Sequence, residues 1–74
     1  MQDSPGTDQK RILILRLPDV CKMTGLGRSM IYQLEAERRF PSRIRIGSRA
    51  VGWVDAEVQR WLALRIESYR AGVQ

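Results

Sequence analysis

Two glycines separated by a single residue, Gly25-Leu26-Gly27, interrupt the chain between two short segments of helical pattern. The segment before them, residues 18–24, begins with a proline, which suits the first helical position. Asp19 follows in the first turn, where the helix dipole favours an anion. Gly25 supplies the left-handed residue that ends such a helix. The sequence therefore predicts two short helices joined by a tight turn, which is the helix-turn-helix pattern.

The second of these helices is predicted over residues 28–37, with Gly27 as its cap. Ile31 and Leu34 are three residues apart and face inward together, and Leu26 before the cap can pack on Ile31. The helix ends before Phe40-Pro41, because the residue preceding a proline is pushed out of the helical region. The outward or near-outward positions are Arg28, Ser29, Met30, Tyr32 and Gln33.

A short β-hairpin is predicted after the second helix. Residues 43–46 alternate polar and apolar, which is the period of a half-buried strand. Gly47-Ser48 is a turn signal, and residues 50–53 are suited to the return strand. The alternation places Arg43, Arg45 and Arg49 on the outer face or tip, and Ile44 and Ile46 on the inner face.

A third helix is predicted from residue 56 to about residue 69, capped by Asp55. Val58, Trp61 and Leu62 form its inward face, and we expect Trp53 in the core as well. Residues 12–17 are either a short strand or an extended lead-in. The predicted organisation is one domain over residues 12–70, with a flexible tail at 1–11 and a C-terminal tail at 71–74. The fold class is mainly α with a small β-hairpin.

The positive charge is concentrated in the middle of the chain. Residues 28–49 hold six arginines against two glutamates, a net +4 out of +5 for the whole chain. The sequence pI of about 10.4 indicates a polyanionic partner, either nucleic acid or an anionic membrane. The alternative is a solvated surface that only keeps the protein soluble.

The remaining composition argues against several classes of function. Cys21 is the single cysteine, so we expect no intramolecular disulfide, and a thiol that fills space between two helices. The sequence has no apolar run of about 18 residues and no signal peptide, which predicts a cytoplasmic protein without membrane contact. Because it has no histidine, no paired carboxylates and no metal-ligand cluster, we expect no enzyme, catalytic residue, metal, cofactor or small-molecule ligand.

Double-stranded DNA is the partner that the predicted elements fit. In a helix-turn-helix the second helix enters the major groove, where Arg28 can bond guanine and Gln33 adenine. The hairpin arginines can neutralise phosphates or enter a minor groove. Tyr32 has two interpretations, packing on the hairpin or contacting DNA. A protein-interaction module using Leu64, Ile66 and Tyr69 is the main rival, and RNA binding is the weaker third.

The order of several short motifs resembles the AlpA family, small phage and prophage regulators related to excisionases and to the DNA-binding domains of the MerR superfamily. The resemblance covers residues 13–63. The motifs are Leu17-Pro18-Asp19-Val20, Thr24-Gly25-Leu26, Ile31-Tyr32, Phe40-Pro41, Ile46-Gly47, Arg49, Gly52-Trp53 and Glu57-Val58-x-x-Trp61-Leu62.

The resemblance implies a winged helix-turn-helix with three helices and a two-stranded wing, sequence-specific DNA binding and transcriptional control. By position it assigns Arg28, Ser29, Met30, Tyr32 and Gln33 to the major groove, and Arg43, Arg45 and Arg49 to the wing. It also implies an alternative, an excisionase-like architectural factor that contacts an integrase or self-associates on DNA. The chain departs from the family at Gly27, where Ser is common, and at Met30, where Thr is common.

Overall fold

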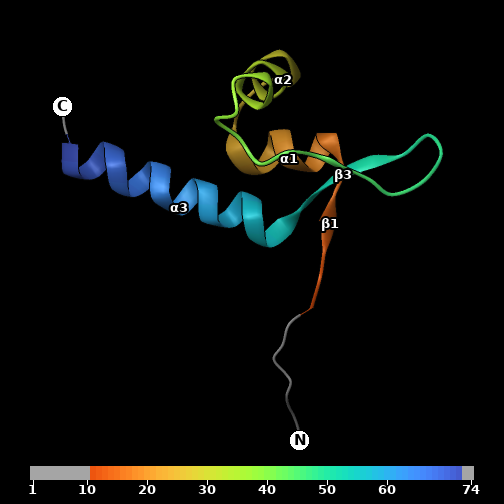
Figure 1. Cartoon of the computed structure of the whole chain (residues 1–74). Coiled ribbons are helices and arrows are strands. Elements are labelled where there is room, and N and C mark those ends of the chain that lie inside the picture. Colours follow the sequence, from red (N-terminus) through yellow and green to blue (C-terminus); the bar gives the residue numbers. More distant parts are fainter. Residues whose placement is uncertain (1–10, 73–74) are drawn as a thin grey trace, which may run out of the picture.

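The computed structural model describes residues 11–72, and the positions expected in the N-terminal tail before Arg11 lie outside this range, as do residues 73–74. Three helices and three short strands form the described part (Figure 1). In chain order they are β1 (Ile14–Leu15), α1 (Leu17–Thr24), α2 (Arg28–Ala36), β2 (Ile44–Arg45), β3 (Val51–Val54) and α3 (Asp55–Gly72). The mainly helical winged helix-turn-helix predicted from the sequence is confirmed.

The turn between α1 and α2 is fixed by local hydrogen bonds. Gly25 adopts the left-handed conformation (φ 76°), and its N–H donates to the Cys21 carbonyl at 2.8 Å. The Thr24 hydroxyl donates to the Val20 carbonyl at 2.8 Å and accepts from the Leu26 N–H at 3.2 Å. In Figure 1, α2 is seen nearly end-on above α1, so the two helices cross steeply. The predicted tight turn is confirmed.

Helix α2 begins after the Gly27 cap, as predicted, and ends at Ala36. The residue that stops it is Arg38, which has a positive φ of 62°. Its N–H donates to the Glu35 carbonyl at 3.0 Å, and the next N–H donates to the Leu34 carbonyl at 2.8 Å. This pattern closes the last turn of a helix and is usually made by glycine. The helix therefore ends at this closing turn, and Pro41 is not what ends it.

The sheet is antiparallel throughout, with strand order β1-β3-β2. The predicted wing is the β2–β3 hairpin, whose turn is closed by the Ile46 and Gly47 N–H groups donating to the Ala50 carbonyl at 2.9 and 3.2 Å. Strand β1 pairs with the other edge of β3, which resolves residues 12–17 in favour of a strand at Ile14–Leu15. Gly52 lies between the two neighbours of β3, where an added Cβ would come within 2.9 Å of the Leu15 carbonyl oxygen.

The core lies where the three helices meet β3, and six buried hydrophobic residues form it. They are Val20, Ile31, Leu34, Phe40, Trp53 and Val58. The inward positions predicted in α2 and the core positions Val58 and Trp53 are confirmed. Trp61 and Leu62 are half-buried and pack against this cluster, as Cys21 does.

The predicted inner face of the hairpin is wrong. Ile44 and Ile46 are 40% and 45% exposed, because the hairpin projects beyond the helices of the described part of the chain (Figure 1). Alternation along a strand determines which residues share a face, but it does not determine whether that face is covered. Ile46 lies over Gly52 instead, with its methyl carbon 3.5 Å from the position of an added Cβ there.

Helix α3 begins at Asp55, whose N–H donates to the Leu13 carbonyl at 2.8 Å, and runs to Gly72, past the predicted end near Tyr69. Its second half extends away from the wing (Figure 1). The predicted domain limits of 12–70 stay a prediction. No helix within residues 11–72 is long and apolar enough to cross a membrane.

Candidate nucleic-acid interface

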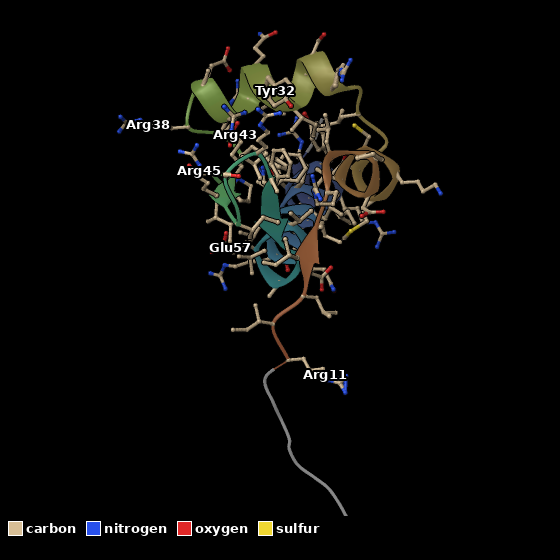
Figure 2. The ribbon with its side chains drawn as sticks, turned by 90° about the vertical axis from the view of Figure 1, so that its right-hand side faces the viewer. Arg11, Tyr32, Arg38, Arg43, Arg45 and Glu57 are labelled. Atoms are coloured by element: carbon tan, nitrogen blue, oxygen red, sulfur yellow. The ribbon has the colours of Figure 1, made fainter. Side chains whose placement is uncertain are left out.

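The outer face of α2 presents the residues predicted for the major groove. Ile31 and Leu34 point into the core, and their burial turns the other side of the helix to solvent. Tyr32 lies on α2 at the upper edge of the molecule in Figure 2. The exposed residues on this side are Arg28, Ser29, Met30, Tyr32 and Gln33. One of them already has a partner, since the Gln33 amide donates to Glu37 Oε2 at 3.3 Å.

Ion pairing divides the six central arginines into two groups. Arg39 pairs with Glu37 at 3.4 Å, and Arg43 pairs with Glu35 at 3.1 Å. Within residues 11–72, the other four arginines of this segment have no carboxylate within salt-bridge distance; they are Arg28, Arg38, Arg45 and Arg49. All four are exposed, and Figure 2 shows Arg38 and Arg45 on the same side of the molecule. The net +4 therefore resides on solvent-facing side chains of α2, the turn after it and the wing.

The wing cations differ in what holds them. Arg45 folds back on the turn of the hairpin, where its Nε donates to the Gly47 carbonyl at 3.3 Å and a terminal nitrogen donates to the Ser48 carbonyl at 3.2 Å. Arg49 is exposed at the tip. Both side chains are exposed, and Arg45 additionally stabilises the turn from which Arg49 projects.

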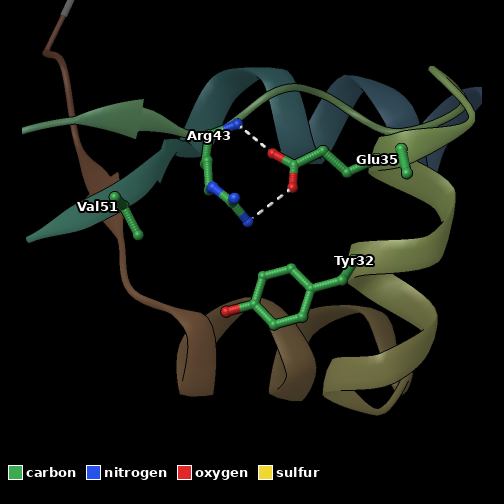
Figure 3. A pocket seen from close by; sticks show the side chains of 5 residues that line it. Tyr32, Glu35, Arg43 and Val51 are labelled. Atoms are coloured by element: carbon green, nitrogen blue, oxygen red, sulfur yellow. Dashed lines mark hydrogen bonds and ion pairs between the residues drawn. The ribbon is translucent and has the colours of Figure 1, made fainter.

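Arg43 has a more constrained position than the sequence indicated. Glu35, in the last turn of α2, accepts from the Arg43 backbone N–H at 2.6 Å through one oxygen and from its guanidinium at 3.1 Å through the other (Figure 3). The guanidinium also lies 5.2 Å from the centre of the Tyr32 ring. Sequence reasoning missed Glu35 because the pair joins residues eight positions apart, beyond any helical or strand spacing.

Tyr32 packs at the base of the wing, which is the first of its two interpretations. Together with Glu35, Ala36, Arg43 and Val51 its ring lines a hollow of about 560 Å³ between α2 and the hairpin (Figure 3). The residue is 38% exposed, so part of it remains available to a ligand. Arg38 was also missed: its cation follows α2 directly, in the left-handed conformation that closes the helix.

The polar groups exposed on this surface are suited to binding an anionic partner. Within residues 11–72 no group of three or more His, Cys, Asp and Glu side chains could hold a metal ion. The exposed groups are hydrogen-bond donors and fixed cations on a helix and a hairpin. Such groups recognise anions and base edges.

Comparison with known proteins agrees with this geometry. Residues 13–66 match the family model described as the prophage CP4-57 regulatory protein (AlpA). The chain is 38% identical over 68 residues to the uncharacterized protein ORF88 of Enterobacteria phage P4, covering 92% of this chain and 75% of that protein. It is 34% identical over 64 residues to the DNA-binding transcriptional activator AlpA of Escherichia coli (strain K12), covering 78% of this chain and 91% of that protein. This chain belongs to the AlpA family of prophage regulatory proteins.

Proposed function

We propose that this protein is a sequence-specific, double-stranded DNA-binding regulator of phage, prophage or other mobile-element genes. Helix α2 lies in the major groove, and the wing lies on the phosphate backbone or in a minor groove. The observation that carries the proposal is the placement on α2, its end and the wing of four cations that pair with no carboxylate of the described residues, Arg28, Arg38, Arg45 and Arg49. The name of the Escherichia coli relative, a DNA-binding transcriptional activator, supports it.

The side chains on α2 are suited to reading bases. Arg28 can make two hydrogen bonds to guanine, and Gln33 can do so with adenine once it leaves Glu37. Ser29 can bond either a base or a phosphate. Met30 is 43% exposed and offers an apolar contact to a thymine methyl group. Tyr32 contributes through its exposed part. These residues give sequence preference, while the wing cations give affinity.

The first prediction is steep salt dependence of duplex binding. If the four arginines that make no ion pair within residues 11–72 each neutralise one phosphate, the slope of log K against log salt concentration is about −3.6. The measurement is a titration of a labelled duplex, recovered by selection from a random library, at several salt concentrations. An affinity that stays flat from low to moderate salt contradicts the proposal.

The second prediction separates reading from positioning. Arg28→Ala or Gln33→Ala relaxes sequence preference by about 1–3 kcal/mol for each base that the variant no longer bonds. Arg49→Ala weakens the selected and a scrambled duplex about equally and lowers the salt slope by about one. Arg49 is a cleaner wing probe than Arg45, whose side chain also bonds the turn. If the wing variants and not the helix variants change the preferred sequence, the assignment is wrong.

An excisionase-like architectural factor or a protein-interaction module acting with an integrase is the second candidate. The observation that favours it is apolar exposure on the second half of α3. Leu64, Ile66 and Tyr69 are 53%, 50% and 72% exposed. The titrations already described exclude a module that binds only protein if the salt slope for DNA is steep. An architectural factor also binds DNA, and it differs from a regulator in requiring these three residues for assembly.

A further inference from the structure

The Glu35–Arg43 pair lies at the junction between the two parts of the proposed DNA surface. Glu35 is in the last turn of α2, and Arg43 directly precedes β2, the first strand of the wing. Both oxygens of the carboxylate are used, one by the Arg43 backbone N–H at 2.6 Å and one by its guanidinium at 3.1 Å. A contact to the backbone fixes the position of the chain and not only of a side chain. The pair therefore holds the start of the wing at a set distance from α2.

The surroundings of the pair shield one of its two partners. The Glu35 side chain is only 13% exposed, the Arg43 side chain is 45% exposed, and the Tyr32 ring lies 5.2 Å below the guanidinium (Figure 3). Reduced solvent access weakens screening of the pair, and a cation over an aromatic face gains further attraction. The Arg39–Glu37 pair nearby is different: its side chains are 63% and 42% exposed, and it joins residues only two positions apart.

We infer that Glu35 is a positioning residue that determines DNA specificity, by holding Arg43 as a strut between α2 and the wing and withholding its charge from phosphates. The inference rests on the proposed function. A wing held in place before binding loses less conformational freedom when helix and wing engage DNA together. That benefit applies to the sequence on which both dock, whereas a freed arginine would attract every sequence equally.

The central test compares Glu35→Ala with Glu37→Ala, because a glutamine would keep an amide oxygen that can still accept the same N–H. Each substitution removes one negative charge near the end of α2 and frees one arginine. Both therefore raise affinity for a scrambled duplex and steepen the salt slope by about 0.9. Glu35→Ala alone also lowers the ratio of selected to scrambled affinity, by about three- to tenfold, because it alone loosens the wing. Glu37→Ala frees the Gln33 amide for base contact and does not lower this ratio. A ratio equal to that of the wild type in Glu35→Ala overturns the inference.

The double variant Glu35→Ala/Arg43→Ala distinguishes a strut from a direct phosphate contact. It restores the wild-type net charge and removes both ions. If Arg43 is a strut, the salt slope returns to the wild-type value while the specificity ratio stays reduced. If Arg43 itself neutralises a phosphate, the slope becomes shallower by about 0.9, and the inference is wrong. Thermal unfolding of each variant identifies any loss of folded protein before titration.

A measurement without DNA separates failure of the inference from failure of the proposed function. Hydrogen exchange of the Arg43 backbone amide reports its bond to Glu35 directly. Glu35→Ala accelerates this exchange about tenfold or more, and Glu37→Ala leaves it unchanged. If the exchange rate is unchanged in Glu35→Ala, Glu35 does not hold Arg43 in place, whatever ligand the protein binds. A protected amide in a protein with flat salt dependence instead overturns the proposed function, and the specificity role of Glu35 with it.

Discussion

Trp53→Ala is expected to unfold the protein. Trp53 is fully buried on β3, opposite Leu15 of β1, and its core neighbours come from all three helices. Truncating a buried tryptophan to alanine costs about 3–5 kcal/mol, through reduced burial and the cavity that remains. A single core in a chain of fewer than about 80 residues supplies a stability of roughly the same size. The variant should therefore lose the cooperative thermal transition in circular dichroism, and DNA binding with it.

Trp53→Phe is the matched control. Within the described residues the buried Trp53 Nε1 donates to no protein acceptor, so the main change on substitution by phenylalanine is a smaller ring in the same apolar site. We expect a cost of about 1 kcal/mol, or a midpoint lowered by about 4–8 °C. If Trp53→Ala melts cooperatively at the wild-type midpoint, β3 does not anchor the core as described.

Trp61→Ala is expected to cost about 3 kcal/mol, the lower end of the range for large aromatic truncations, because this side chain is half-buried. Its Nε1 donates to the Arg39 carbonyl at 2.7 Å, and its ring packs edge-on against Phe40 at 4.8 Å between centroids. Trp61 thus joins α3 to the segment that leads from α2 to the wing. The variant should keep at most about 2 kcal/mol of stability, be partly unfolded at 37 °C and bind DNA more weakly, although Trp61 lies outside the proposed DNA surface.

Trp61→Phe separates the two contributions of this residue. Phenylalanine keeps an aromatic ring against Phe40 and loses the hydrogen bond to Arg39, which costs about 1 kcal/mol. Urea unfolding of both variants gives the two free energies directly. A folded Trp61→Ala protein with an unchanged urea midpoint would show that α3 does not stabilise the domain. Partner binding would then explain Trp61 better than a role in stability.

The core position of Trp61 could be predicted from the sequence, but its contacts could not. Helical spacing groups it with Val58 and Leu62 on one face, and that face does pack on the core. The hairpin residues expected on an inner face, Ile44 and Ile46, prove to be exposed and are not part of the cluster that Trp61 packs against. Trp61 contacts Phe40 instead, a residue that in the sequence only marked the end of a helix. Which partner covers a helix face depends on the path of the chain between elements, and a periodic pattern carries no information about that path.

In the candidate site, too, the positions of residues could be predicted from the sequence and their contacts could not. The outward face of α2 follows from the inward pair Ile31 and Leu34, because a helix with one buried face must turn the opposite one to solvent. The number of cations in the central segment could be counted directly. Which of them are paired depends on distance in space, and Arg43 meets Glu35 only because the chain turns back between them. Because the sequence does not show this pairing, the prediction grouped Arg43 with the wing arginines Arg45 and Arg49.

What the sequence by itself determined is local. The proline and aspartate that start α1, the left-handed Gly25 that ends it and the Gly47-Ser48 turn act within a few residues, where backbone conformation and hydrogen bonding are decided by neighbours in the chain. Only the tertiary structure decided the pairing of β1 with β3, the exposure of the hairpin isoleucines and the strut between Glu35 and Arg43. Each of these joins segments distant in sequence, and such contacts form only when the packing of the whole chain brings the segments together.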